Sequence, residues 1–210
     1  NAAAAVDATA AGDLWDNTLG ISTGNAGNSP KAGPGGDGLV QYTLPTLADG
    51  VAINLTYASA GENNEGSGAV GLVYTGIEGL TVSLGSSEDN SSATVSADYT
   101  TMKASYAYGS ITAAVSTSEY DHTTAANDQE VKSWGLTYTV TDDISVSYGV
   151  DTIENNTDTA DVEVDGITAS YTSGGMTVTA KKVGADNVDG SSTGTNNNNE
   201  MFKLSASFAF

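Results

Sequence analysis

The chain ends on EMFKLSASFAF, residues 200–210, where apolar and polar side chains alternate without interruption. Neighbouring side chains of a β-strand point to opposite faces, so this alternation predicts a strand with one apolar and one polar face. Chain termini are usually polar and frayed. An alternation that lasts to the final residue therefore predicts a last strand with apolar surroundings along its whole length. Its apolar face would hold Phe202, Leu204, Ala206, Phe208 and Phe210, and its polar face Lys203, Ser205 and Ser207.

The same alternation governs the chain from residue 38 onward. In SWGLTYTV, residues 133–140, every second residue is large and apolar, and the residues between them are small or hydroxylated. The connections are polar and alternate between long and short, which is typical of an antiparallel meander with short turns at one end and long loops at the other. The pattern predicts eleven strands, at residues 38–46, 50–60, 67–76, 79–88, 92–108, 110–120, 129–141, 143–154, 161–173, 175–185 and 199–210.

The composition excludes several classes of protein. Only 39 % of the 210 residues are hydrophobic, whereas a soluble domain is about half apolar. Six Lys and no Arg stand against 26 Asp and Glu, a formal net charge of −20, so no nucleic-acid partner is expected, because phosphate binding needs clustered basic residues. Without Cys there is no disulfide or thiolate metal site. No apolar run approaches the roughly 20 residues of a membrane-spanning helix.

Alternating strands fit either a soluble sandwich, with the apolar face inward, or a membrane barrel, with the apolar face toward lipid and a wet interior. The predicted strands are long enough to supply the roughly 9–11 residues that cross a bilayer when tilted. Aromatic residues gather at the short-turn ends, as in the interfacial belt of a membrane barrel. We therefore predict an all-β fold, an antiparallel up-and-down transmembrane β-barrel. Its aromatic belt would comprise Tyr74, Tyr106, Tyr108, Tyr138, Tyr171, Phe208 and Phe210.

The lysines test which face meets lipid, because a Lys that faces the middle of the bilayer costs about 2–4 kcal/mol in such barrels. With the apolar face outward, Lys103, Lys181 and Lys203 fall on the inner face. Lys132 and Lys182 fall on the outer face, but near the long loops. There their side chains can extend to the membrane surface.

One segment, TVSADYTTMKASYAYG at residues 94–109, changes the phase of the alternation. Apolar residues such as Tyr99 occupy odd positions in its first half, and residues such as Met102 occupy even positions in its second half. A β-bulge inserts one extra residue into a strand. A bulge near Thr100 and Thr101 would keep both sets of apolar residues on one face, so we predict it there.

These features resemble the general diffusion porins of Gram-negative outer membranes. FKLSASFAF resembles the terminal strand of a porin, whose last Phe is read by the outer-membrane assembly machinery, and residues 37–64 resemble the two strands after the third porin loop. The family has sixteen strands, so the resemblance implies that these eleven are the sixth to sixteenth and that five precede residue 1. Residues 1–37 would form the pore-constricting loop, and residues 38–210 the transmembrane strands and loops. The alternative is a twelve-stranded barrel that begins with LWDNTLGIST, residues 14–23.

The resemblance implies a water-filled outer-membrane channel for passive diffusion of small hydrophilic solutes and ions. It also implies a homotrimer surrounded by lipid and lipopolysaccharide, with long loops that could act as a phage receptor. Porins narrow the pore between acidic loop residues, here Asp13, Asp16 and Asp37, and a basic wall, although the arginine ladder of the family is absent. The acidic loops favour cations at the pore mouth. The candidate pore-lining residues are Lys103, Lys181, Lys203, Ser205, Ser207, Thr137 and Ser147.

Little in the sequence indicates catalysis or a metal site. His122 is the only histidine, and neighbours such as Ser118 and Asp121 on the same loop cannot adopt the geometry of a catalytic triad, so no enzyme is expected. The stretch DVEVDG, residues 161–166, begins like a calcium loop but has Thr172 where an EF-hand requires Glu. A loop-bound divalent cation such as calcium is the only cofactor to consider. Its candidate ligands are Asp158, Asp161, Glu163 and Asp165.

A different class of protein is also compatible with the acidic loops. A secreted β-rich adhesin or surface-layer module would use them to bind calcium or glycans. Such proteins usually show a fixed short repeat, and the sequence has none. The strand pattern and the closing segment therefore favour the porin.

Overall fold

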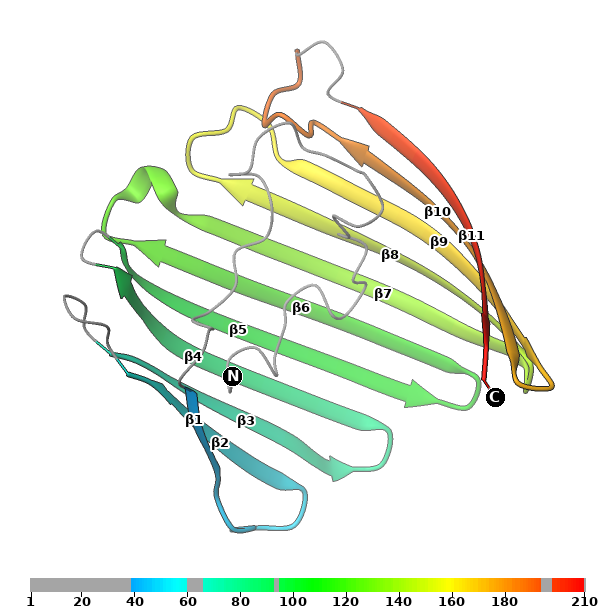
Figure 1. Ribbon diagram of the computed structural model, residues 1–210, viewed down its shortest axis with the longest axis horizontal. Coiled ribbons are helices and arrows are strands. Elements are labelled where there is room, and N and C mark those ends of the chain that lie inside the picture. The colour runs from blue at the N-terminus through cyan, green and yellow to red at the C-terminus, as the bar shows by residue number, and fades with distance from the viewer. Residues whose placement is uncertain (1–38, 60–65, 93–94, 194–197, 210) are drawn as a thin grey trace.

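The computed structural model describes residues 39–59, 66–92, 95–193 and 198–209. They form one antiparallel sheet whose eleven strands are neighbours in the same order as in the chain (Figure 1). The strands are β1 (Leu39–Thr43), β2 (Val51–Ala58), β3 (Ser67–Ile77), β4 (Leu80–Ser92), β5 (Val95–Tyr108), β6 (Ile111–His122), β7 (Gln129–Thr141), β8 (Ile144–Asn155), β9 (Val162–Ser173), β10 (Met176–Asp186) and β11 (Asn199–Phe208). The prediction of an all-β, up-and-down antiparallel sheet is confirmed.

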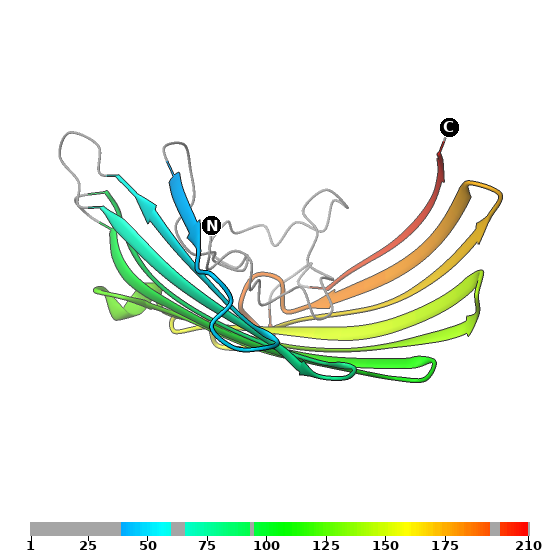
Figure 2. The same ribbon diagram turned by 90° about the horizontal axis from the view of Figure 1, so that it is seen from below.

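The sheet is strongly curved. Figure 2 shows it as a trough with β1 and β11 at its two rims. Within the described residues these two strands pair only with β2 and β10, so the sheet is not closed. The described helical structure is one 3₁₀ turn, η5 (Ala125–Asn127). No helix in the described ranges has the length and hydropathy needed to cross a membrane.

Local sequence explains where strands end. β1 stops at Thr43, earlier than expected, because Pro45 has no N–H to donate to a ladder. The turn from β3 to β4 contains Gly79, whose φ of 76° suits glycine. A Cβ on Gly79 would also collide with the carbonyl oxygen of Ala107 on β5. Tight turns of this kind hold one end of the sheet, and the longer loops lie at the other end.

The curved sheet has a convex and a concave face, and neighbouring side chains of each strand point to opposite faces. The chain after β10 turns toward the concave side (Figure 2). Val188 in this connection packs in a buried cluster on β7 to β10, which identifies that face of those strands as the concave one. The cluster consists of Val131, Ile153, Val162, Val164, Val183, Ala185 and Val188. The convex face carries exposed large side chains, such as Trp134, Leu136 and Tyr138 on β7.

The alternation in the sequence indicates a concave face that is polar throughout. In the structure this face is only partly polar. Toward the long-loop end it holds the valine-rich cluster and a second cluster of Ala97, Tyr99 and Tyr120. The described residues after β10, up to residue 193, are held over this end. The carbonyl oxygen of Gly190 accepts hydrogen bonds from the backbone N–H groups of Thr159 (2.9 Å) and Ala160 (3.2 Å). The less buried, polar part of the concave face therefore lies nearer the short turns.

The predicted bulge at Thr100 and Thr101 is wrong. β5 pairs without interruption with β6 from Ala97 to Tyr108, and with β4 from Ala97 to Tyr106. The register shift lies between Asp89 and Ser92 of β4 instead. Tyr99 therefore stays on the concave face, where it is buried against Tyr120, and Met102 is exposed on the convex face. The apolar phase changes because β5 contributes to both faces.

Candidate functional site

Near the short turns, the concave face carries rows of hydroxyl groups on β9, β10 and β11. Ser170 Oγ and Thr179 Oγ1 lie 3.3 Å apart, and Thr172 Oγ1 and Thr177 Oγ1 lie 3.1 Å apart. Ser205 is the register partner of Thr179 and continues the row onto β11. Short hydroxylated side chains of this kind offer hydrogen bonds to water without filling the space above the sheet.

The concave face also carries three lysines. Lys181 of β10 lies directly opposite Lys203 of β11 and, on its other side, Thr168 of β9. Lys103 stands apart on β5, between Ser83 and Ser116. Within the described part of the chain, none of the three has a carboxylate at ion-pair distance. The structure places all seven predicted pore-lining residues on this face: Lys103, Lys181, Lys203, Ser205, Ser207, Thr137 and Ser147.

The two lysines of the convex face, unlike those of the concave face, lie close to carboxylates. Lys132 Nζ lies 2.7 Å from Glu130 Oε2 and 4.0 Å from Glu154 Oε2. Lys182 Nζ lies 3.3 Å from Glu200 Oε1. Both convex lysines therefore have carboxylate partners, and both lie on the long-loop halves of their strands, β7 and β10.

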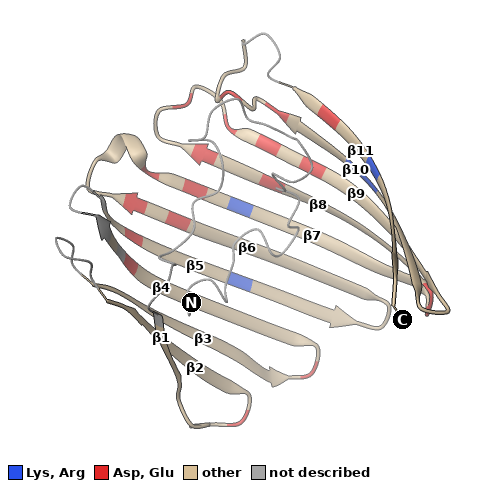
Figure 3. Ribbon diagram, viewed as in Figure 1, with Lys and Arg blue, Asp and Glu red and all other residues tan. Residues whose placement is uncertain are grey.

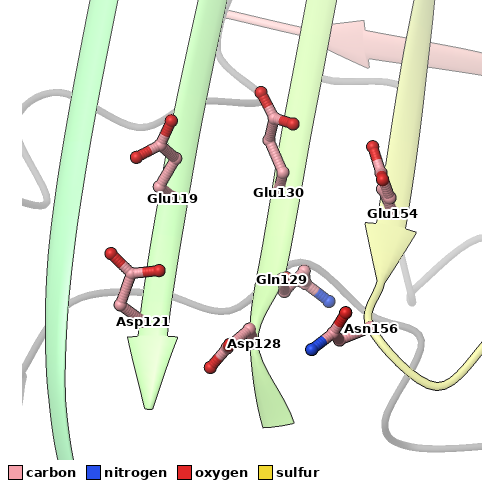
Figure 4. A pocket seen from close by; sticks show the side chains of 7 residues that line it. All are labelled: Glu119, Asp121, Asp128, Gln129, Glu130, Glu154 and Asn156. Atoms are coloured by element: carbon pink, nitrogen blue, oxygen red, sulfur yellow. The ribbon is translucent and has the colours of Figure 1, made fainter. Parts of the chain in front are cut away.

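Most strand carboxylates also lie toward the long-loop ends (Figure 3). On the convex face, Glu119, Glu130 and Glu154 are direct register partners across β6, β7 and β8. Figure 4 shows them side by side at the edge of a pocket of about 230 Å³. The pocket is lined by Glu119, Asp121, Asp128, Gln129, Glu130, Glu154 and Asn156. The sequence alone does not predict this group, because its members come from separate segments that only the strand register aligns.

The predicted divalent-cation ligands are not gathered into one site. Asp158 accepts a hydrogen bond from Asn155 Nδ2 at 2.8 Å in the loop after β8. Glu163 and Asp165 occupy alternate convex positions of β9, and Asp165 Oδ2 accepts a 3.4 Å hydrogen bond from the Tyr148 hydroxyl. Asp161 follows Asp158 in the chain and lies just before β9. Among the described residues, no group of three or more His, Cys, Asp or Glu side chains is arranged to hold a metal ion.

His122 is not part of a catalytic arrangement with its neighbours. Its Nδ1 accepts the backbone N–H of Thr124 at 2.8 Å. Ser118 shares the parity of His122 on β6, whereas Asp121 has the opposite parity and is exposed beside the acidic pocket. The strand therefore places Asp121 and His122 on different faces of the sheet.

The predicted aromatic belt lies on the convex face as far as it is described. Tyr106 and Tyr108 stack with ring centroids 6.5 Å apart, and both are exposed. Trp134 and Tyr148, which the belt did not include, form a further tilted pair at 5.5 Å. The other described belt residues are Tyr74, Tyr138, Tyr171 and Phe208.

Several predictions concern residues outside the described part of the chain. These are the constricting loop at residues 1–37, its aspartates Asp13, Asp16 and Asp37, and the alternative first strand LWDNTLGIST. Phe210, the last residue of the predicted belt, is also outside it.

Comparison with known proteins places the sheet in a family. Residues 1–191 match the family described as Gram-negative porin, and no curated protein sequence matches. In vitro folded OmpT, an outer membrane protein of Vibrio cholerae, is 20 % identical with a TM-score of 0.61, over 80 % of this chain and 62 % of that one. Its trimer form gives 19 % and 0.60, over 81 % and 64 %. An anion-selective porin from Comamonas acidovorans gives 14 % and 0.58, over 70 % and 48 %.

The three structural matches support the fold, and the family match supports membership of a family. At these identities the matches show a shared fold, and the chain spans 48 % to 64 % of the length of these proteins. The family match covers most of the chain and agrees with a sheet that is apolar on its convex face. The chain belongs to the Gram-negative porin family, whose members are proteins of the outer membrane.

Proposed function

We propose that the protein forms a water-filled channel in the outer membrane, through which small hydrophilic solutes and ions diffuse passively. The observation that carries this proposal is the difference between the two faces of the sheet. The convex face exposes large apolar side chains such as Leu136, Leu204 and Phe208, which suits contact with lipid. The concave face presents hydroxyl groups and unpaired lysines, which suits contact with water. Membership of a porin family favours a channel over an enzyme.

In this proposal the channel wall consists of the hydroxyl rows and the lysines Lys103, Lys181 and Lys203. Selectivity in such a channel depends on the charges and hydrogen-bonding groups that line it. Thr137 and Ser147 are direct register partners on β7 and β8 and extend the wall away from the lysine pair. The acidic side of the constriction would come from Asp13, Asp16 and Asp37 of the N-terminal segment.

The surroundings of the channel are also proposals. A homotrimer is supported by the related OmpT of Vibrio cholerae, for which a trimer form is known. Lipid would cover the apolar part of the convex face, and lipopolysaccharide would meet its outer end. The long loops would be accessible to phage. The adhesin alternative gains no support from the family match or from the structural relatives.

A conductance measurement tests the proposal. Native protein purified from outer membranes in mild detergent is added to a planar lipid bilayer in KCl solution. We expect stepwise increases in current, in groups of three if the protein is a trimer. A folded protein that inserts into the bilayer and gives no current steps would contradict the channel. Folding is checked independently, because a folded barrel migrates differently in a gel before and after boiling.

A further inference from the structure

The two faces of the sheet carry opposite charge, which the net charge of −20 conceals. Among strand residues with described side chains, the concave face has one carboxylate, Asp151, and it is fully buried. The same face has Lys103, Lys181 and Lys203. The convex strand carboxylates are Glu88, Asp98, Glu119, Asp121, Glu130, Glu154, Glu163, Asp165, Asp186 and Glu200.

Lys181 and Lys203 are the closest of the concave lysines. Direct register partners on antiparallel strands have Cβ atoms about 4.5–5.5 Å apart, and like charges at such positions repel each other. The two residues are direct partners, and no described carboxylate pairs with either. Two lysines at directly paired positions, with no described carboxylate at ion-pair distance from either, create a local positive potential. An anion between them would relieve their repulsion.

The neighbours of the pair can also donate hydrogen bonds. Thr168 lies directly across from Lys181 on β9. Thr179 and Ser205, themselves register partners, occupy the next concave positions toward the turns. Hydroxyl and ammonium groups both donate to oxyanions, and bonds that involve a charged group are the stronger ones. The surroundings therefore suit a carboxylate or phosphate better than a cation.

We propose that Lys181 and Lys203 form a binding site for small oxyanions, carboxylates or phosphates, on the concave wall. This inference rests on the proposed function, because it requires that the concave face borders the water of the channel. The site holds an anion transiently between two ammonium groups, with hydroxyl groups beside it. It raises the local concentration of anions in the pore, whereas the acidic composition alone predicts a preference for cations.

The test measures how inorganic phosphate reduces KCl current through the native protein in planar bilayers. The double variant Lys181→Gln/Lys203→Gln should require about tenfold more phosphate for the same reduction, since it loses charge-assisted hydrogen bonds. Its chloride-to-potassium permeability ratio should fall as well. Lys182→Gln is the matched control, because it removes the same charge one residue away but on the convex face, where Lys182 pairs with Glu200. The control should behave like the unchanged protein.

The outcomes separate the two proposals. No current steps in the unchanged protein would contradict the channel itself. Normal current steps with equal phosphate sensitivity in the unchanged protein and the double variant would overturn the anion site and leave the channel standing. An equal effect of Lys182→Gln would also overturn it, because net charge would then explain the result. If the Gln double variant does not fold, Lys181→Arg/Lys203→Arg keeps both charges and should retain phosphate sensitivity, and its loss would contradict the site.

Discussion

Lys181 and Lys182 are neighbours in the chain and lie on opposite faces of β10. Lys182, on the convex face, has its ammonium 3.3 Å from a Glu200 carboxylate oxygen. Lys181, on the concave face, lies opposite another lysine, Lys203. Lysine therefore has a carboxylate partner on one face of β10 and none among the described residues on the other. The difference shows that position along the strand, and not composition, decides what charge each side of the sheet presents.

The concave face itself has two regions. Near the long loops it is apolar and buried, with Val164 and Val183 fully inaccessible. Nearer the turns it carries Thr168 and Lys181, four and two positions away on the same strands. The change from valine to hydroxyl and ammonium along a single face marks where packing ends and where the proposed water-filled wall begins.

The largest effect is expected from a charge placed in the buried region. Val164→Asp would put a carboxylate directly opposite the buried Asp151. An uncompensated buried charge costs roughly 3–5 kcal/mol, so the free energy of unfolding, measured by urea titration in lipid vesicles, should fall by about that amount. Thr168→Asp is the control, because it places the same carboxylate opposite Lys181. Similar losses in both variants would contradict the division of the concave face.

A smaller effect is expected from a lysine on the lipid-facing side. Leu136→Lys would put an ammonium on the convex face of β7, away from the long loops. A Lys that faces lipid costs about 2–4 kcal/mol near the middle of the membrane and less near its surface. Thr137→Lys, the next residue, points to the concave face and should change the free energy of unfolding little. If Thr137→Lys were the more costly, the assignment of the two faces would be reversed.

Strand positions and faces followed from the sequence because a period of two, repeated in eleven segments, leaves few alternatives. The face on which Tyr99 lies could not be predicted from the sequence. The same phase change would result from a bulge or from a buried Tyr99 on the concave face. Only the pairing of β5 with β6 shows that Tyr99 packs on Tyr120. The row of Glu119, Glu130 and Glu154 was missed for the same reason, because the register between strands is not written in any one segment.

That carboxylate row gives the next prediction. Glu119 is a direct partner of Glu130, and like charges at such positions destabilise a sheet. Glu119→Gln should therefore raise the free energy of unfolding by about 0.2–1 kcal/mol. The gain should shrink when the titration is repeated at high salt, because salt screens exposed charges. A loss of stability that salt does not alter would show that Glu119 contributes through packing or hydrogen bonding instead of repulsion.

The smallest effects concern the two lysines of β10. Lys182 and Glu200 are both more than half exposed, at 56 % and 73 %, and exposed ion pairs contribute little. Glu200→Gln should therefore lower the free energy of unfolding by roughly 0.5 kcal/mol or less. Lys203→Glu should act in the other direction, because it gives Lys181 the carboxylate partner that Lys182 already has. Urea titrations of both variants at low salt measure the two changes. Opposite signs would confirm that only the concave lysine lacks a partner, and a loss in both would show that the Lys181–Lys203 repulsion is already relieved in the native protein.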